Sequence, residues 1–257
     1  MYLCVMLTAK EIIGYMETLR NEKQRQVLMG FFKTGPGEYG EGDEFLGLKV
    51  PQTRQVVKLA VGDTPLDEVP ELLMSRWHEV RLCGLLMLVD KFGQLAKKRL
   101  ENDEAAIKGR DAIVTLYLQY AERANNWDLV DLSAPKIIGS WLLLPSHLGD
   151  KRVIMDELAS STNLWKQRMS MVSTWKTTQQ GDPSWCLRYA EWHLRHKHDL
   201  MHKAVGWMLR EMGKRCSMEL LRQFLERHAQ EMPRTALRYA IEKMSLEERR
   251  QWMDLPS

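Results

Sequence analysis

The chain has 257 residues, of which 44% are hydrophobic and 28% charged, a composition typical of a globular protein with a sizeable core. Gly and Pro are too few for a low-complexity or collagen-like chain, and no apolar run is long enough for a membrane span. Residues 1–150 hold 18 Lys and Arg against 21 Asp and Glu, whereas residues 151–257 hold 19 against 13. The basic second half favours an anionic partner such as nucleic acid, although ordinary surface charge gives the same pattern.

The four cysteines (Cys4, Cys83, Cys186 and Cys216) are scattered and form no CxxC pair. They favour reduced thiols in a cytoplasmic protein over a zinc ribbon or a disulfide scaffold. The opening MYLCVML lacks a basic flank and is too short for a signal peptide. We expect residues 1–7 to be disordered or additional to the domain, with either Met1 or Met6 as the start.

Apolar residues recur at helical period along almost the whole chain, and no segment alternates as a strand would. In the first half, the pattern predicts helices over 9–20, 26–33, 69–77, 78–96 and 109–124. In the second half, it predicts helices over 151–160, 165–178, 184–196, 199–215, 218–229 and 233–244. With the helix expected at NNWDLVDLSAP, about eleven or twelve helices result, so the predicted class is all-α.

The segment 34–54, TGPGEYGEGDEFLGLKVPQTR, is predicted to be a structured loop, because five glycines fall within residues 34–47. A Gly-rich loop can cradle phosphate, but this one lacks the GK[ST] ending of a P-loop. Its acidic side chains (Glu38, Glu41, Asp43 and Glu44) would also repel phosphate. Two roles stay open for the loop, namely shaping the packing of the N-terminal helices or approaching DNA through its backbone.

Similar helix openings recur near residues 77, 127, 165, 203 and 235, a spacing of about 30–50 residues that brackets HEAT and armadillo repeats. Helix pairs of that kind stack into a curved solenoid with a concave binding face. We therefore predict a single domain over residues 1–257 that forms a HEAT-like solenoid, an α-α superhelix. A non-repetitive helical bundle is the alternative.

Candidate chemistry starts in NNWDLVDLSAP, at residues 125–135. On a helix, Trp127 and Asp131 lie four residues apart and share one face, whereas Asp128 is rotated away from that face. We assign Asp128 a structural or capping role. A Trp at helical spacing commonly packs in a core, so the pair alone does not establish a site.

Cationic and aromatic side chains recur on two later helices. Arg168 and Lys176 fall on one face, and Lys203, Trp207 and Arg210 follow at i, i+4 and i+7. If equivalent helices line one wall, these side chains converge in a groove of cations and indoles around the carboxylate of Asp131. An Arg near an Asp is also the pattern of an ordinary structural ion pair.

The segment HLRHKHDLMH holds His193, His196, His198 and His202. His198 and His202 have the spacing of a zinc pair, but Asp199 stands where the HExxH motif requires Glu. We expect a solvated helix end here and no metal site. No Ser-His-Asp order or Cys-His nucleophile pattern is found either.

Five segments between residues 31 and 244 occur in the order FFKTGPGEYGEGDEFLGLKVPQTR, NNWDLVDLSAP, LWKQRMSMVSTWK, DLMHKAVGWMLREMGKR and MPRTALRYAIEKM, within a resemblance that covers roughly residues 10–245. Together they resemble the DNA alkylation repair family, the AlkD-like HEAT-repeat DNA glycosylases. The resemblance implies a helical solenoid that cradles double-stranded DNA in a basic concave groove. It also implies excision of alkylated purines of the N3-methyladenine and 7-methylguanine type, without full base flipping.

The resemblance also assigns roles to single residues. Trp127 and Asp131 match the family's Trp and catalytic Asp, and Arg168 matches its active-site Arg. The residues expected to bind DNA are Trp207, as the second indole of the cleft, and Lys176, Arg210, Lys203 and Phe31. Phe31 stands where some members have Tyr, so it keeps an aromatic face and loses a hydroxyl.

The implied chemistry fits these residues. A cationic alkylpurine leaves without a general acid, and a carboxylate such as Asp131 can stabilise the positive charge that passes to the sugar. Because no lysine is poised as a Schiff-base nucleophile, we expect a monofunctional glycosylase, a hydrolase without cofactor. We expect it to act as a monomer in a bacterial-type cytosol, with no membrane and no obligate protein partner. The alternatives are a non-catalytic HEAT-like binder of damaged or branched DNA and a protein-binding helical scaffold.

Overall fold

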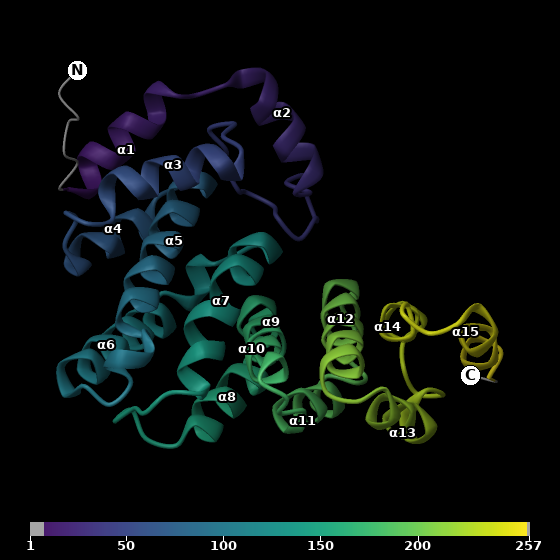
Figure 1. The fold of residues 1–257 in the computed structure, drawn as a ribbon. Coiled ribbons are helices and arrows are strands. Elements are labelled where there is room, and N and C mark those ends of the chain that lie inside the picture. Colours follow the sequence, from purple (N-terminus) through teal and green to yellow (C-terminus); the bar gives the residue numbers. More distant parts are fainter. Residues whose placement is uncertain (1–7, 256–257) are drawn as a thin grey trace. The chain divides into compact units, whose positions relative to one another are not determined.

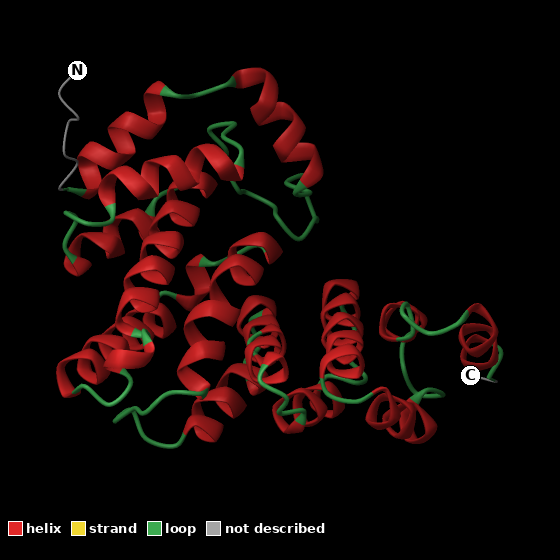
Figure 2. Ribbon diagram, in the orientation of Figure 1, coloured by secondary structure: helices red, strands yellow, loops and turns green. Residues whose placement is uncertain are grey.

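The computed structural model describes residues 8–255, which form helices joined by turns and loops (Figure 1). Within that range there is no strand, and the β-type pairing is an isolated bridge between Glu44 and Trp77 (Figure 2). The prediction of an all-α, helical-repeat fold is confirmed. The expectations for residues 1–7, including the choice of Met1 or Met6, lie outside the described residues.

The chain divides into two compact units. Unit 1 runs to Ser133 and includes residues 145–147, and unit 2 comprises Ala134–Leu144 together with the residues from Leu148 onward. The division falls inside α7 (Trp127–Leu142). The expectation of one domain over the whole chain stays a prediction.

Unit 1 is built around α5 (His78–Leu95), which packs against α3, α4 and α6. Residues 78–88 of α5 are all buried, so this helix is enclosed by its neighbours on every side along its first three turns. The other helices of this unit are α1 (Ala9–Thr18), α2 (Glu22–Phe31), α3 (Val50–Ala60), α4 (Val69–Met74), α6 (Glu104–Gln119) and the start of α7.

Unit 2 is built around α12 (Asp199–Arg215), which packs against α9, α10, α11, α13 and α14. A Cβ added at Gly206 would lie 2.3 Å from the carbonyl oxygen of Ala236, so α12 and α14 approach each other there as only glycine permits. The other helices are α8 (Lys151–Ser160), α9 (Leu164–Val172), α10 (Thr174–Gln179), α11 (Ser184–Trp192), α13 (Met218–His228), α14 (Arg234–Ala240) and α15 (Leu246–Met253).

Helix starts follow capping chemistry. A side-chain oxygen accepts a backbone N–H of the first turn at several N-caps, namely Thr8, Asn21, Asp103, Asp150, Asn163, Ser217 and Ser245. Each such bond satisfies one of the N–H groups that a helix leaves unpaired at its N-terminus. These caps account for the short polar breaks between apolar runs.

The structure differs from several of the predicted elements, and three differences are instructive. The loop expected over 34–54 ends earlier, because Pro51 sits in the first turn of α3, where its missing N–H costs nothing. The helix expected over 165–178 breaks at Ser173, where the hydroxyl of Thr174 donates to the carbonyl of Met171. Helix α15 was not predicted, because its sequence LEERRQWM consists mainly of charged and amide side chains and shows no apolar period.

No helix among residues 8–255 is long and apolar enough to cross a membrane.

Candidate functional site

The candidate site begins at the first turn of α7. The side-chain oxygen of Asn126 accepts the backbone N–H of Trp127 at 2.8 Å, and its carbonyl accepts the N–H of Val130 at 3.2 Å. Trp127 and Asp131 are both half-buried and lie one turn apart. Pro135 has no N–H to donate to the carbonyl of Asp131, four residues earlier, so the helix hydrogen bonding is interrupted beside this residue.

Trp127 and Asp131 line a pocket of about 420 Å³ in unit 1. The walls come from the end of α2, the segment leading into α3, one side of α5 and the start of α7. The lining is mainly aromatic and aliphatic, comprising Leu28, Phe31, Phe32, Phe45, Leu48, Val50, Pro51, Leu82, Trp127 and Leu132, with Lys49, His78, Glu79, Asp128 and Asp131 as its polar members. Of the predicted site residues, this pocket brings together Phe31, Trp127 and Asp131.

The aromatic side chains of the pocket pack on one another. Phe32 stacks on Phe45 with 5.3 Å between ring centroids, and Phe45 stacks on His78 at 4.4 Å. The indole of Trp127 lies 5.5 Å from the ring of Phe32 and 5.9 Å from that of Phe31. Because Phe31 is 59% exposed, the series runs from the buried imidazole out to a solvent-facing ring.

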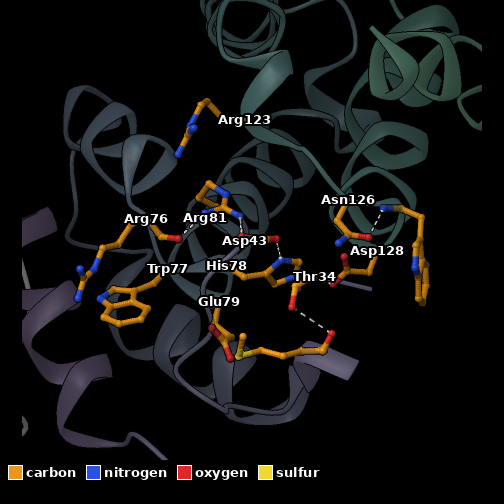
Figure 3. A network of polar contacts seen from close by, with 12 residues as sticks. Thr34, Asp43, Arg76, Trp77, His78, Glu79, Arg81, Arg123, Asn126 and Asp128 are labelled. Carbon is orange, nitrogen blue, oxygen red and sulfur yellow. Dashed lines mark hydrogen bonds and ion pairs between the residues drawn. The ribbon is translucent and has the colours of Figure 1, made fainter. Parts of the chain in front are cut away.

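Behind the pocket, His78 lies between two carboxylates (Figure 3). Its Nδ1 atom is 2.8 Å from Asp43 and its Nε2 atom 2.9 Å from Asp128, and Arg81 forms an ion pair with Asp43. All four side chains are more than nine-tenths buried. The cluster therefore ties the loop before α3 and the first turn of α7 to the start of α5.

The two carboxylates determine the charge of His78. Burial by itself would lower the pKa of the imidazole, but Asp128 and Asp43 outweigh it and raise that pKa to about 9. Burial would likewise raise the pKa of Asp43, yet His78 and Arg81 hold it below its ordinary value. At neutral pH the cluster then holds two buried cations and two buried carboxylates.

Glu79 fixes the end of the Gly-rich loop. Its carboxylate accepts backbone N–H groups from Leu46 at 2.8 Å, Gly47 at 2.8 Å and Leu48 at 3.0 Å. Gly47 has φ +91°, and a Cβ there would lie 2.1 Å from the carbonyl oxygen of Asn21. The loop thus meets the start of α2 at a point where only glycine fits.

Two of the acidic residues of the loop, Glu38 and Glu41, bond backbone N–H groups of the loop itself. Glu38 accepts the N–H of Gly35 and Glu41 that of Gly37, each at 2.9 Å, while Asp43 is buried against His78. Of the two roles left open by the sequence, these contacts support shaping the packing of the N-terminal helices.

Sequence reasoning missed the cluster of Asp43, His78 and Arg81, although the structural role assigned to Asp128 is confirmed. The available signal was HEVR at residues 78–81, where three ionisable side chains open an otherwise apolar helix. Charged residues at positions enclosed on all sides require buried partners. The partners lie 35 and 50 residues away along the chain, beyond the reach of local periodicity.

The remaining predicted residues belong to unit 2. Arg168 on α9 is buried, and its guanidinium donates to the carbonyl of Leu200 at 2.5 Å, at the start of α12. Lys176 on α10 and Trp207 on α12 are half-buried. Lys203, Trp207 and Arg210 lie on α12 with the predicted i, i+4, i+7 spacing.

Two of the cations expected to bind DNA have carboxylate partners within unit 2. Lys203 lies 2.7 Å from Asp199, and Arg210 forms ion pairs with Glu242 and, at 3.4 Å, with Glu211. Asp199 and Glu242 are more than one-third exposed, and such pairs contribute only about 0–1 kcal/mol. The free-energy cost for Lys203 or Arg210 to leave its carboxylate partner and pair with an anionic ligand is therefore small.

The histidine-rich segment lies at a helix end, as the sequence predicted, but one of its histidines is not solvated. His193 is buried and its Nε2 atom lies 2.8 Å from the hydroxyl of Ser170, and burial lowers its pKa to about 4. His198 caps α12 by accepting the N–H of Leu200. The expectation failed for His193 because periodicity places this residue at a helix end without showing which neighbour covers it. Within residues 8–255, no three side chains of His, Cys, Asp or Glu are arranged to hold a metal ion.

Comparison with known proteins adds a family and a fold. The family model described as DNA alkylation repair enzyme matches residues 12–244. Among solved structures, a predicted DNA alkylation repair enzyme from Enterococcus faecalis matches with a TM-score of 0.67 and 14% sequence identity, covering 88% of this chain and 97% of that one. At that identity the likeness concerns the fold alone. No curated protein matches the chain.

Proposed function

Because the chain belongs to the DNA alkylation repair enzyme family, we propose that it is a monofunctional DNA glycosylase. Its substrate is double-stranded DNA that carries cationic alkylated purines, such as N3-methyladenine and 7-methylguanine. The reaction is hydrolysis of the N-glycosidic bond. Family membership itself indicates a role in the repair of alkylated DNA, and the reaction and substrate are the further step.

The observation that carries the proposal is the position of Asp131. Its carboxylate lies at the wall of an aromatic pocket, one helical turn from the indole of Trp127. An alkylpurine that is already cationic leaves as a neutral base, and the positive charge passes to C1′ and the ring oxygen of the sugar. A carboxylate beside that sugar stabilises the developing charge, while the faces of Trp127 and Phe31 attract a cation by about 0.5–2 kcal/mol each.

Water completes the reaction. Attack of a water oxygen on C1′ forms the new C–O bond, and the proton that water releases passes to Asp131 or to solvent. No step requires a covalent enzyme intermediate, so the proposed enzyme leaves an abasic site and does not cleave the strand.

Unit 2 supplies the affinity for the DNA backbone in this proposal. Arg168, Lys176, Lys203 and Arg210 contribute positive charge, and Trp207 contributes a stacking surface. Phosphate contacts of this kind do not depend on sequence and weaken as salt rises. We place the protein in the cytoplasm as a monomer that needs no cofactor.

The direct test is release of free base. Purified protein is incubated with methylated duplex DNA, and free 7-methylguanine and 3-methyladenine are measured by mass spectrometry. We expect wild-type protein to release base and Asp131→Asn to lose at least about 100-fold in rate, because removal of one stabilising group costs 10²–10³ in kcat. The matched control is Asp90→Asn, which removes a carboxylate from an exposed position on α5 and should release base at the wild-type rate.

The outcomes separate the candidate functions. Equal rates for Asp131→Asn and wild type would overturn the assigned mechanism. DNA binding by the wild type without any base release would favour the alternative, a non-catalytic binder of damaged or branched DNA. A binding affinity that does not change with salt concentration would point to a protein-binding scaffold instead.

A further inference from the structure

The side chains that would act on DNA stand on a short stretch of α7, which a buried hydrogen bond joins to the start of α5. Asp128 directly follows Trp127 and precedes Asp131 by less than one helical turn. Its Oδ2 atom bonds the Nε2 atom of His78, whereas its Oδ1 atom has no hydrogen-bond partner among residues 8–255. In the described part of the chain, His78 is thus the hydrogen-bond partner that holds this side chain.

We propose that His78 and Asp128 are positioning residues, which set the placement of Trp127 and Asp131 at the pocket through the His78–Asp128 contact. The inference rests on the proposed function for the identity of the reaction. It assigns these two residues, which also line the pocket, a role that acts through Trp127 and Asp131.

Asp128 and Asp131 lie close together along α7, so a movement of one is readily transmitted to the other. In an α-helix each residue advances about 1.5 Å, so Asp128 and Asp131 are separated along the axis by about 4.5 Å of hydrogen-bonded backbone. A shift of the first turn of α7 is therefore transmitted to the carboxylate of Asp131. Farther along, Pro135 interrupts the helix hydrogen bonding, so the turns beyond it restrain Asp131 less than a continuous helix would.

The imidazole is itself rigidly placed. Asp43 holds its Nδ1 atom, and the ring of Phe45 stacks on it at 4.4 Å. Asp43 in turn is paired with Arg81, whose guanidinium also donates to the carbonyls of Ser75 and Arg76 at 3.0 and 2.9 Å. The anchor for α7 is thus the core of unit 1.

Charge balance gives the contact its strength. With His78 protonated, the buried carboxylates of Asp43 and Asp128 face the cations of His78 and Arg81. Removing the imidazolium leaves Arg81 to pair with Asp43 and deprives Asp128 of its partner. A buried carboxylate without a partner moves toward water or takes up a proton, and either change displaces the first turn of α7.

Two substitutions of one residue separate positioning from general stability. In His78→Gln the side-chain amide reaches the place of Nε2 and keeps a donor toward Asp128. In His78→Asn the shorter amide takes the place of Nδ1 and keeps only the contact with Asp43. Both variants lose the buried imidazolium, so we expect similar losses of thermal stability, and kinetics are compared at equal folded fraction.

The expected result is a difference in kcat. Because misplacement by about 1 Å costs on the order of 100-fold, we expect His78→Asn to lose about 10- to 100-fold in kcat and His78→Gln to stay within about fivefold of wild type. KM should change by less than about twofold in both, because the proposed backbone contacts lie in unit 2. The matched control is His193→Asn, at a buried histidine of unit 2, which should lower stability and leave kcat unchanged.

A readout without chemistry accompanies the kinetics. The ¹⁵N–¹H signal of the Trp127 indole, assigned by comparison with Trp127→Phe, reports the placement of the first turn of α7. We expect this signal to move in His78→Asn and to stay in His78→Gln and His193→Asn. Equal kcat values and unmoved indole signals in both His78 variants would overturn the positioning role. If the wild type released no base, the glycosylase proposal would fail, and the indole signal would still decide the positioning role.

Discussion

The Nε2 atom of His78 lies 2.9 Å from a carboxylate oxygen of Asp128, in a place where both side chains are more than nine-tenths buried. The contact connects the most enclosed helix of unit 1 to the turn that carries Trp127. A second buried histidine, His193, faces the neutral hydroxyl of Ser170 instead. One chain therefore holds two buried histidines whose surroundings favour opposite charge states.

These two histidines predict how stability depends on pH. The raised pKa of His78, about 9, contributes stability that is complete below pH 6.5 and is lost as pH rises through 9. The depressed pKa of His193, about 4, makes protonation costly, so stability falls as pH drops from 6.5 toward 4. From the shift of His78 we expect a loss of about 3 kcal/mol between pH 6.5 and pH 9.5.

Urea unfolding at several pH values measures this loss. The groups that face His78 are Asp43 and Asp128, with Arg81 behind Asp43. His78→Gln should therefore show a flatter stability curve between pH 6.5 and 9.5 than the wild type. An alkaline loss of equal size in both proteins would assign it to other groups.

Gly47 and Gly37 form a matched pair of substitutions in the Gly-rich loop. Both have positive φ, +91° and +77°, but only at Gly47 would a Cβ meet backbone, 2.1 Å from the carbonyl oxygen of Asn21. Gly37→Ala should cost about 1–2 kcal/mol from backbone strain alone. Gly47→Ala should cost more than about 3 kcal/mol, because α2 must also move. Chemical denaturation measures both, and equal losses would contradict the close approach of the loop to α2.

The carboxylate of Glu79 accepts three backbone N–H groups, and the side-chain amide of glutamine cannot accept all three. Glu79→Gln would turn an NH₂ group toward the N–H of Leu46 or toward those of Gly47 and Leu48, leaving buried donors unpaired. We expect a loss of about 2–4 kcal/mol in the free energy of unfolding. The control is Glu71→Gln, at an exposed position in the first turn of α4, which should change stability by less than about 0.5 kcal/mol. Small losses in both variants would show that the loop does not depend on the carboxylate.

The ion pair of Arg210 with Glu242 predicts that substitutions of these two residues change DNA affinity in opposite directions. If Arg210 binds a phosphate, Arg210→Ala should weaken binding for all sequences and lower the slope of log K against log salt by about 1. Glu242→Gln removes the competing carboxylate and should strengthen binding at low salt. Fluorescence anisotropy across salt concentrations measures both slopes, and an unchanged slope in Arg210→Ala would remove this residue from the interface.

Much of the fold could be predicted because an amphipathic helix gives a periodic pattern of apolar residues in its own sequence. Apolar spacing marked most helices, and residues typical of helix starts stand at some of their N-termini, such as Asn163 before α9 and Pro70 in α4. Helix α15 shows no such pattern, because most of its residues carry charged or amide side chains. Along 165–178 the apolar period continues through Ser173 and predicts one helix. The structure has a break at Ser173, beside the hydrogen bond from the hydroxyl of Thr174 to the carbonyl of Met171.

The candidate site could be predicted only where its residues are neighbours in sequence. Trp127 and Asp131 are four residues apart, so their spacing predicted a shared helix face. Asp128 was assigned another role only because its position on the helix is rotated from that face. The partners of Asp128 and Glu79 are set by tertiary packing, which leaves no period in the sequence. The sequence therefore indicated three of the residues that line the pocket, Phe31, Trp127 and Asp131, and not the residues that hold them there.

The anchoring of α7 on His78 also bears on how the molecule folds. His78 joins a residue 35 positions before it to one 50 positions after it, and each connection closes a long loop at an entropic cost. Contacts between such distant residues form late on the folding pathway and slow it. During synthesis, His78 and Asp43 emerge well before Asp128, and a nascent chain that ends before α7 holds a buried imidazole with only one of its two carboxylates. The pocket therefore stays incomplete in a nascent chain until the first turn of α7 has been made and docks on His78.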